Sequence, residues 1–540
     1  MSANKPPLPG IYLLVPVFVA SLLYFTNLSK TDLWKPDEPR YALVAREMLD
    51  SDSFIVPRLD GAAYTEKPPL FFWIAAGFSK LTGGVNQLSM RLPPAICAIG
   101  VILLLIFFMR QFFDERSAMV GGVVLAVSPL FFWLARSGQI DMLFTLLISA
   151  SLFSFYRWYA SGKRIYLPLF YACMVLAALA RGPLGILLPA LIVLAFVLLR
   201  REPLRLRDMR LHIGVPIAAI LLLAWYIPAS RTAGGCSIGA ILREQLSGRA
   251  LNAGEQGVRP YVRPFYSVAW LIAWMAPWSL LIPVAAIAGV RARLDSARLF
   301  LLVWAAAVLV FATLMAGGRA AGLLPMYPAA AGLVGVWLCG QGTRGDEWLV
   351  RAVAFAWGLL LIAAGIAAIV AAPAFLEKRF PGVTLPANWK EVLVVWIASG
   401  AAAAAVALLG KEVRHYVSAC VVTLVAVFIT TYSNVLPWID SYRSPRAACR
   451  RYVSDWQEGM QLGVLGNLDY EYAFYARVKL ASRQELKEYF AAEEVRFCFV
   501  SNEDYQQALA EHDFPMYELD KWFGASRVTL LLCNRNLNAH

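Results

Sequence analysis

The chain has 540 residues, of which 59% are hydrophobic and only 16% charged, whereas soluble domains carry roughly 25% charged residues. Such a composition excludes a disordered chain and a coiled coil, and eight cysteines are too few for a small disulfide scaffold. The net charge of +13 lies largely beside apolar stretches, which indicates membrane orientation and not nucleic-acid binding.

Apolar stretches close to 20 residues long recur along most of the chain and predict a polytopic α-helical membrane protein. The first runs from Gly10 to Leu28, and no small-residue cleavage site follows it, so we expect a retained helix and not a signal peptide. Further spans are expected near residues 91–109, 118–135, 140–156, 166–180, 183–199, 212–230, 266–289, 298–316, 320–340, 352–372, 391–410 and 415–436. The sequence therefore predicts about thirteen transmembrane helices.

Basic residues predict how these spans are oriented. With a cytoplasmic N-terminus, every connection expected on the inner side carries Lys or Arg, as in the cluster Arg200, Arg201, Arg205, Arg207 and Arg210. An odd number of crossings then places the segments 29–90 and 231–264, and the region from about residue 437, on the outer side. We expect the chemistry in these outer parts.

The chain becomes more polar after Leu436, which predicts a membrane domain over 1–436 and a small soluble α/β domain over 437–540. Strands are expected at Gln461–Leu465, Val495–Val500 and Val528–Cys533, and a helix at Ser482–Glu494. Cysteines in the spans are expected to pack in the core, and these are Cys97, Cys173, Cys339 and Cys420. The outer cysteines are Cys236, Cys449, Cys498 and Cys533. Cys498 and Cys533 would either form a disulfide or remain two buried thiols.

The motif W-K-P-D-E-P-R-Y-A, from Trp34 to Ala42, follows the first span. An interfacial helix over 40–49 would hold Asp37 and Glu38 at the membrane surface. Asp37 would then act as a general base or orient a phosphate leaving group, or else it would only cap the helix.

Two more polar motifs occur in outer positions. In Y-T-E-K-P-P-L, Glu66 is a candidate metal ligand beside the cation Lys67, although the two side chains could equally form an exposed ion pair. In R-S-G-Q-I-D-M, Asp141 adjoins a span on the same face as Asp37, which is costly for an acid without a function or partner.

Arginines at outer helix ends are candidates for binding phosphate. Arg181 and Arg319 lie in apolar surroundings, where a guanidinium either binds an anionic lipid or extends to the interface. The second outer loop adds Arg243, Arg249, Arg259 and Arg263, which suit an anionic partner or lipid headgroups.

With these motifs the chain resembles the bacterial lipid A aminoarabinose transferases, which belong with the protein O-mannosyltransferases among integral-membrane glycosyltransferases. The resemblance covers roughly 1–340 and rests on D-E-P-R-Y-A, Y-T-E-K-P-P-L, the R-L-P start at Arg91, the acid of I-D-M, A-R-G-P at Arg181 and L-P-M-Y-P at 324–328. It implies a sugar donor on undecaprenyl phosphate, transfer on the periplasmic face of the inner membrane, and lipid A or another periplasmic lipid or glycan as acceptor.

The resemblance also implies roles for single residues. Asp37 would be the principal catalytic carboxylate, with Asp141 as the second. The substrate-binding candidates are Glu38, Tyr41, Tyr64, Glu66, Lys67, Arg181 and Arg319, with Glu66 also a candidate metal ligand.

Two departures from the family pattern bear on the metal. Segment 231–264 lacks the histidine expected as partner of Glu66, and Tyr261-Val262-Arg263 stands at its place; the expected tyrosine three residues after Arg319 is Gly322. We therefore expect Lys67 and the loop arginines to neutralise the donor phosphate, the alternative being a hard ion such as Mg²⁺ held with Glu244 or Glu255. The alternative functions are an O-mannosyltransferase-like enzyme and a lipid transporter or flippase.

Overall fold

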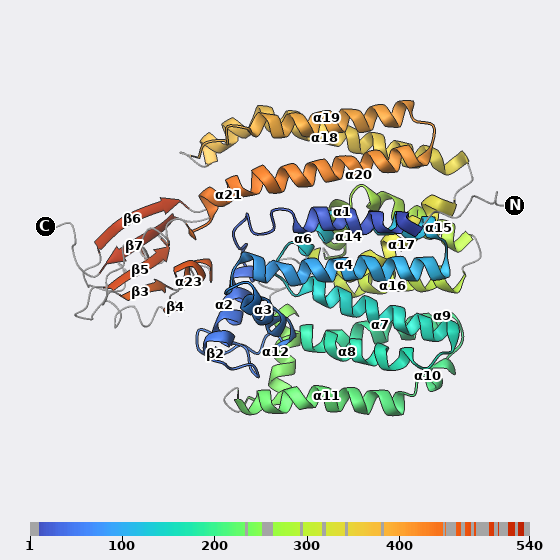
Figure 1. Cartoon of the computed structure of the whole chain (residues 1–540), viewed down its shortest axis with the longest axis horizontal. Helices are drawn as coiled ribbons and strands as arrows, with labels where there is room; N and C mark the ends of the chain where they lie inside the picture. The colour runs from blue at the N-terminus through green and yellow to red at the C-terminus, as the bar shows by residue number, and fades with distance from the viewer. Residues whose placement is uncertain are drawn as a thin grey trace.

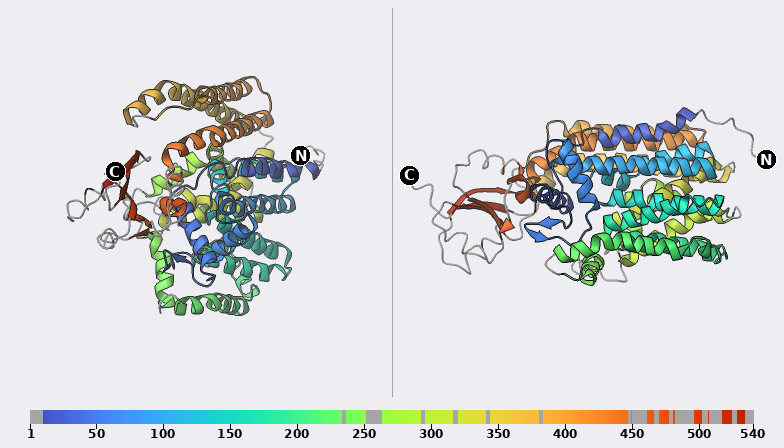
Figure 2. Two further views of the ribbon diagram at one scale, coloured as in Figure 1. Left: turned by 60° about the vertical axis from the view of Figure 1, so that its left-hand side comes forward. Right: turned by 60° about the horizontal axis from the view of Figure 1, so that its bottom comes forward.

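The structure is a computed structural model of the chain. It describes residues 10–232, 236–250, 263–291, 295–315, 320–340, 344–379 and 383–446, then Cys449 and the segments 461–465, 470–476, 480–481, 496–501, 506, 517–523 and 528–533. Figure 1 shows long helices lying side by side, with a small sheet at one end of the bundle and the N-terminus at the other. The two further views in Figure 2 agree on this arrangement.

The first outer segment lies at the end of the bundle that carries the sheet (Figure 1). The chain reaches it through a 3-10 helix, η1 (Gly10–Leu14), and helix α1 (Val15–Phe25). The helix expected near residues 40–49 runs as α2 (Asp37–Asp50). It is followed by a two-stranded hairpin, β1 (Arg58–Leu59) and β2 (Ala62–Ala63), and by helix α3 (Leu70–Leu81).

The centre of the bundle is held together by buried aromatic side chains. Its helices are α4 (Gln87–Phe112), α5 (Glu115–Ala126), α6 (Pro129–Ala135), α7 (Asp141–Ser161), α8 (Tyr166–Arg181), α9 (Leu184–Leu199), α16 (Ser296–Met315) and α17 (Tyr327–Gly340). Phe108 of α4 stacks on Phe153 of α7, with 4.5 Å between ring centres, and Tyr156 of α7 stacks on Phe300 of α16 at 4.8 Å. Such ring pairs add to the dispersion contacts that hold helices together where no water is expelled.

Two predicted spans are bent. The stretch predicted at 118–135 breaks between α5 and α6, which meet at 66°. The stretch at 266–289 comprises α14 (Arg263–Trp274), η3 (Trp278–Leu281) and α15 (Ile282–Arg291), with a bend of 114°. Pro129 and Pro277 stand just after the breaks, and proline cannot donate the hydrogen bond that would continue the preceding helix.

The remaining helices extend the bundle on two sides. On one side lie α10 (Arg205–Asp208), α11 (Leu211–Thr232) and α12 (Ile238–Ala250); a 3-10 turn, η4 (Ala320–Met326), precedes α17. On the other lie α18 (Arg344–Arg379), α19 (Trp389–Leu409) and α20 (Val413–Thr430), which continues through a π-helical turn, η5 (Thr431–Val435), into α21 (Leu436–Arg443). A Cβ on Gly358 would lie 2.6 Å from the carbonyl oxygen of Gly400, so α18 and α19 approach closely only because both positions are glycine.

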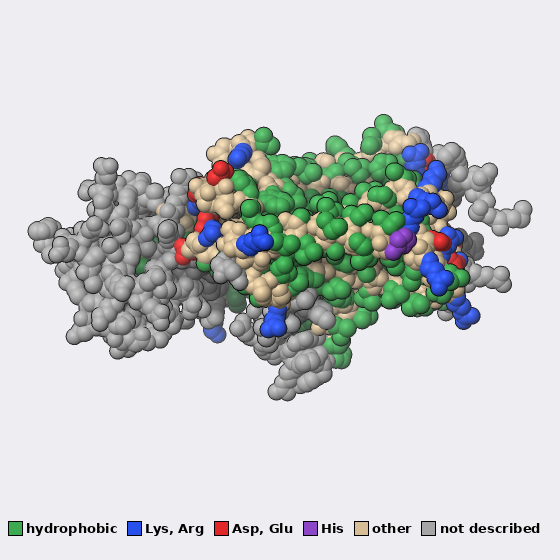
Figure 3. Space-filling view, turned by 90° about the horizontal axis from the view of Figure 1, so that it is seen from below, with side chains coloured by type: hydrophobic (Ala, Val, Ile, Leu, Met, Phe, Trp, Pro, Cys, Tyr) green, Lys and Arg blue, Asp and Glu red, His purple; other side chains and the backbone are tan. Residues whose placement is uncertain are grey.

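The described residues include seven helices long and apolar enough to cross a membrane, or up to nine when each bent pair is one span. Every predicted span coincides with helical structure, but the count of thirteen remains a prediction. Figure 3 shows one face of the molecule, on which hydrophobic side chains cover the middle of the helix bundle and Lys and Arg gather toward its two ends. The protein is therefore an integral membrane protein.

The C-terminal region contains a five-stranded mixed sheet in the order β4-β3-β5-β7-β6. Its strands are β3 (Gln461–Leu465), β4 (Leu480–Ala481), β5 (Arg496–Ser501), β6 (Tyr517–Phe523) and β7 (Val528–Cys533). The three predicted strands are confirmed to within a residue, whereas the helix predicted over 482–494 lies outside the described residues. A short helix, α23 (Tyr470–Ala476), connects the sheet to the bundle (Figure 1).

Free thiols are present at Cys97, Cys173, Cys236, Cys420, Cys449 and Cys498. Cys97, Cys173 and Cys420 are buried in the bundle as expected, and Cys339 is partly buried. Cys498 is also free and buried, and the strand register pairs it with Leu532 while Cys533 pairs with Phe497. Of the two alternatives for Cys498, the free thiol is the one observed. Burial raises the pKa of this thiol well above its usual range, which makes it unreactive.

Candidate functional site

Arg40 joins two of the predicted acids at the end of the bundle that carries the sheet. One terminal nitrogen of Arg40 lies 2.6 Å from Oδ1 of Asp37, and the other lies 3.2 Å from Oε2 of Glu66. Asp37 is the first residue of α2 and Arg40 lies three positions later, so both project from the same side of the first turn. The N-cap position belongs to Pro36, and Asp37 therefore does not serve merely as a capping residue.

Glu66 is surrounded by hydrogen-bond donors. Lys67 pairs with its Oε1, and the hydroxyl of Tyr64 donates to Oε2 over 3.2 Å. Burial alone would raise the pKa of Glu66, but the cations Lys67 and Arg40 outweigh burial, so this pKa lies below its ordinary value. Glu66 is thus an ionised carboxylate held between two cations, Lys67 and Arg40.

Two tyrosines form the apolar side of the same cluster. Tyr41 and Tyr64 are buried, and the guanidinium of Arg40 lies 5.5 Å and 5.7 Å from their ring centres. Burial raises the pKa of Tyr41, and the nearby negative charges of Asp37 and Asp141 raise it further. Tyr41 therefore remains a neutral hydroxyl near both candidate catalytic acids.

Asp141 and Arg181 form an ion pair beside this cluster. Asp141 is the first residue of α7, and Arg181 is the last residue of α8. Their side chains are 13% and 19% exposed, so the pair is partly buried. The guanidinium of Arg181 also lies 5.3 Å from the ring centre of Phe144. The structure therefore brings together Asp37, Tyr41, Tyr64, Glu66, Lys67, Asp141 and Arg181.

Helix α12 of the second outer loop covers the Glu66 segment. Glu244 accepts a hydrogen bond from the hydroxyl of Thr65. Gln245, which is only 2% exposed, donates to the carbonyl oxygen of Thr65 over 3.4 Å and accepts from the hydroxyl of Tyr226 over 2.8 Å. A Cβ on Gly182 would lie 2.8 Å from Oε1 of Gln245, so the residue after Arg181 packs against the same amide. The loop that carries Glu66 is thus bound by two neighbouring side chains of α12, Glu244 and Gln245.

Glu38 is separated from the cluster, contrary to our expectation of a substrate contact. It is 1% exposed and forms an ion pair with Arg91 of α4 at 2.8 Å. Its carboxylate also accepts from the backbone N–H groups of Trp34 and Gly138. These bonds occupy both oxygens, so we correct its assignment to a structural residue that ties α2 to α4.

Several predicted residues cannot be placed. Arg319, Glu255 and Arg259 lie outside the described residues, as do the side chains of Arg249 and Arg263. Arg243 is exposed on α12. Glu244 approaches Thr65 and not Glu66.

The residues around Glu66 do not fit a metal site. No group of three or more His, Cys, Asp or Glu side chains able to hold a metal ion occurs among the described residues. A divalent cation at Glu66 would also stand beside Lys67 and Arg40, whose charges would repel it.

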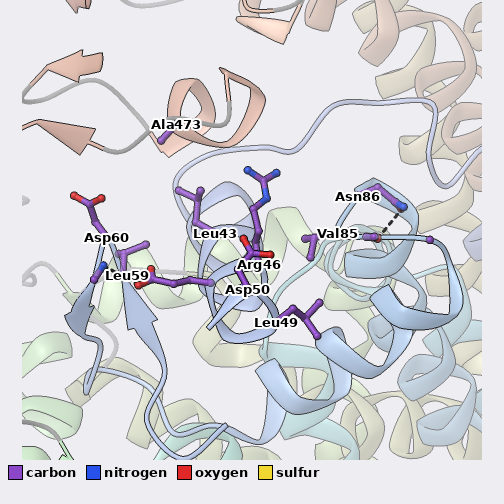
Figure 4. Close-up of a pocket in the computed structure, with 13 residues that line it drawn as sticks. Leu43, Arg46, Leu49, Asp50, Leu59, Asp60, Val85, Asn86 and Ala473 are labelled. Atoms are coloured by element: carbon purple, nitrogen blue, oxygen red, sulfur yellow. Dashed lines mark hydrogen bonds between the residues drawn. The ribbon is translucent and has the colours of Figure 1, made fainter. Parts of the chain in front are cut away.

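A groove with a volume of about 720 Å³ lies on the opposite face of α2 (Figure 4). Leu43, Arg46, Glu47 and Asp50 line it, and their spacing places them on the stripe of the helix that faces away from Asp37 and Tyr41. Ala473 of α23 closes one side. None of the predicted site residues contributes to this groove.

Comparison with known proteins gives three kinds of match. The family described as dolichyl-phosphate-mannose-protein mannosyltransferase matches residues 66–227, a range that includes Glu66, Lys67, Asp141 and Arg181. The undecaprenyl phosphate-alpha-4-amino-4-deoxy-L-arabinose arabinosyl transferase of Shewanella sediminis is 32% identical over 202 residues, 36% of each chain. The protein of that name from Pectobacterium atrosepticum is 26% identical over 479 residues, covering 84% of this chain and 82% of that protein.

The solved structures extend the likeness to the full length. The crystal structure of ArnT from Cupriavidus metallidurans bound to undecaprenyl phosphate superposes with a TM-score of 0.78, at 19% identity, over 99% of this chain and 100% of that chain. The chain has the ArnT fold. The resemblance to aminoarabinose transferases seen in the motifs is confirmed by these matches. The matched part of the chain, however, spans only about two fifths of the length of the first curated relatives.

Reasoning from the sequence missed two residues that build the site, Arg40 and Gln245, and missed Arg91, which pairs with Glu38 away from it. Arg40 and Arg91 stand in the quoted motifs, and their spacing from Asp37 and Glu38 did not show which acid each would meet. Gln245 left no signal, because a single amide in a predicted loop has no pattern that predicts burial.

Proposed function

We propose that the chain is a glycosyltransferase that moves a sugar, aminoarabinose or a related one, from undecaprenyl phosphate to lipid A or another periplasmic lipid or glycan. One observation carries this proposal: two ion pairs, Glu66–Lys67 and Asp141–Arg181, flank Asp37 at one end of a membrane bundle with the ArnT fold. The relatives named above carry this activity in their names, and one neighbour was solved with undecaprenyl phosphate bound.

The cations suit the leaving group of such a reaction. Transfer forms a bond between the anomeric carbon of the sugar and an acceptor oxygen, and it breaks the bond from that carbon to the donor phosphate. The electron pair of the broken bond remains on undecaprenyl phosphate, whose charge increases. We assign Lys67 and Arg181, which are held by ion pairs, to the stabilisation of this charge, since fixed cations near a leaving group lower the barrier.

Asp37 has a role that depends on the acceptor. A phosphate acceptor is already ionised at neutral pH. Asp37 would therefore orient Arg40 and offset part of its positive electrostatic potential, without removing a proton. A hydroxyl acceptor must lose a proton, and Asp37 would then be the general base. The lipid A acceptor makes the first role the one we propose.

The architecture expected for this function goes further than the spans counted above. We place the cluster and the C-terminal region on the periplasmic side of the bacterial inner membrane, with about thirteen helices in the membrane domain 1–436 and a periplasmic α/β domain over 437–540. The basic connection that contains α10 lies at the end of the bundle opposite the sheet, which supports this orientation (Figure 1).

A protein hydroxyl acceptor is the second candidate, because the matching family is that of dolichyl-phosphate-mannose-protein mannosyltransferases. That reaction would need a base, so the pH dependence of transfer would follow the ionisation of one carboxylate. A lipid A phosphate acceptor predicts no such requirement.

The proposal is tested by assaying sugar transfer in detergent. No membrane separates two compartments there, so a transporter or flippase would form no product. Purified protein would be incubated with undecaprenyl phosphate-aminoarabinose and lipid A, and the product detected by the mass added to lipid A. We expect Asp37→Asn to lower the rate at least about 100-fold, because the charges of the site lose their fixed arrangement. Asp50→Asn is the matched control, since Asp50 is the exposed last residue of the same helix. Full activity in Asp37→Asn would contradict the assignment of the site.

A further inference from the structure

The backbone that leads into α2 forms hydrogen bonds with side chains of two later helices, α21 and α23. The N–H of Asp32 donates to Oδ2 of Asp440 over 2.7 Å, and the N–H of Leu33 donates to the hydroxyl of Tyr475 over 2.9 Å. The carbonyl oxygen of Leu33 accepts from Arg443 over 3.2 Å. Three main-chain groups of two neighbouring residues are thus bound by side chains more than 400 positions later in the chain.

Arg443 is the centre of this contact. Its side chain is 8% exposed and donates to Glu471 over 2.6 Å and to Asp440 over 3.4 Å. Its guanidinium also lies 4.4 Å from the ring centre of Trp34. Two buried carboxylates and an aromatic face therefore surround one planar cation, which leaves it little freedom to move.

The contact reaches Asp37 through a short path. Trp34 stands three residues before Asp37, and its N–H donates to Glu38 over 2.7 Å. The ring of Trp34 packs edge-on against Trp133 at 5.6 Å. Further along α2, Arg46 donates to the carbonyl oxygen of Phe474 over 3.0 Å. The C-terminal region thus contacts both the start and the middle of the helix that carries the candidate catalytic acid.

We propose that Arg443 is a positioning residue that sets the start of α2, so that Asp37 and Arg40 meet Glu66 in the geometry needed for transfer. This inference rests on the proposed function. It assigns the C-terminal region a part in catalysis: α21 and α23 hold the catalytic helix from outside the membrane. Arg443 acts through Trp34 and Leu33 and does not itself contact the cluster.

The experiment compares Arg443→Met with Arg443→Lys in the full-length protein in detergent. Arg414→Met is the control, because Arg414 belongs to the same run of helices, is 74% exposed and pairs with Glu412 at the other end of it. Backbone hydrogen exchange of peptides covering residues 29–40 reports on the contact itself. Transfer kinetics with the undecaprenyl phosphate-linked donor report on the site.

We expect Arg443→Met to speed exchange of the Asp32 and Leu33 amides at least about tenfold, because local opening becomes easier. The kcat for transfer should fall about 10- to 100-fold, while the KM for the donor changes by less than about twofold, as misplacement of a reacting group affects the rate more than binding. Arg443→Lys should recover part of the rate.

The inference is overturned when Arg443→Met keeps the wild-type exchange at 29–40 and the wild-type kcat, or loses activity only in proportion to protein that has unfolded. Should Arg443→Met fail to fold, Arg443→Lys decides in its place, and Tyr475→Phe tests the same contact by removing the hydroxyl that accepts from the Leu33 N–H and from Gln87. Absence of transfer in the wild type would contradict the proposed function instead. Hydrogen exchange of residues 29–40 would still show whether Arg443 holds the start of α2.

Discussion

Glu66 is the residue whose charge state decides how the cluster works. Its pKa is lowered because Lys67 and Arg40 overcome the effect of burial. A carboxyl with a lowered pKa in the folded state stabilises the protein above its ordinary pKa, and this contribution is lost as the pH falls through the lowered value. Removing one cation should therefore change both the stability and its pH dependence.

We expect Lys67→Met to be less stable than wild type near neutral pH, because Glu66 stays buried and loses one of the two cations that lower its pKa. The deficit should shrink as the pH falls toward about 4, where a glutamate takes up its proton. Melting temperatures in detergent across this pH range would show it. Lys163→Met is the control, because Lys163 is exposed at the other end of the bundle. Any difference between its melting temperature and that of wild type should not change with pH.

The same donors around Glu66 predict the response to metal removal. Oε1 pairs with Lys67, while Oε2 accepts from Arg40 and Tyr64, so both oxygens are already occupied. We expect transfer to continue at an unchanged rate after extensive treatment with chelator. Activity that disappears in chelator and returns with one added divalent metal would instead make Glu66 a metal ligand.

Among the elements, α12 determines where the Glu66 loop lies. Replacing Gln245 by Leu removes the acceptor of the Tyr226 hydroxyl and the donor to the Thr65 carbonyl, and the buried Tyr226 hydroxyl left unsatisfied costs about 1–3 kcal/mol. We expect a higher KM for the donor, because the displaced loop carries Lys67. Gln111→Leu, an exposed glutamine at the end of α4, is the control and should leave both stability and KM unchanged.

The junction of α2 and α4 depends on the Glu38–Arg91 pair. Both side chains are at most 4% exposed, so Glu38→Gln leaves a buried guanidinium uncompensated, which costs about 3–5 kcal/mol. Thermal unfolding in detergent would measure the loss. Glu115→Gln breaks a pair in which Arg110 is 54% exposed, and we expect less than about 1 kcal/mol there. Equal losses in the two variants would show that Glu38 has no structural role.

The spans and their breaks differ in how far the sequence predicts them. A run of apolar residues predicts a helix of membrane length, and each predicted span is helical in the structure. The bends before Pro129 and Pro277 were not predicted, because the residues on both sides are apolar and the run continues without interruption. Hydropathy measures the length of an apolar stretch, while a bend depends on a single missing hydrogen-bond donor.

At the scale of the molecule, the sequence predicts which residues are chemically able to act, and the fold decides which of them meet. Asp37, Glu66 and Asp141 were grouped on one face from the topology alone, and they do lie together in the structure. Glu38, the neighbour of Asp37, points to Arg91 because successive residues of a helix face different directions. Contacts such as Arg443 with Leu33 join positions too far apart in the chain for any local pattern to predict.

The location of the cluster at one end of the bundle has a consequence for the carrier lipid. Donor and acceptor must both present their headgroups at that end, so the proposed reaction begins and finishes in one leaflet. Each turnover leaves undecaprenyl phosphate with its phosphate still on that side, where it has no sugar to give. The charged headgroup cannot return through hydrocarbon unaided at a useful rate. Continued transfer therefore requires a separate step that flips the spent carrier back or draws on a fresh supply of it.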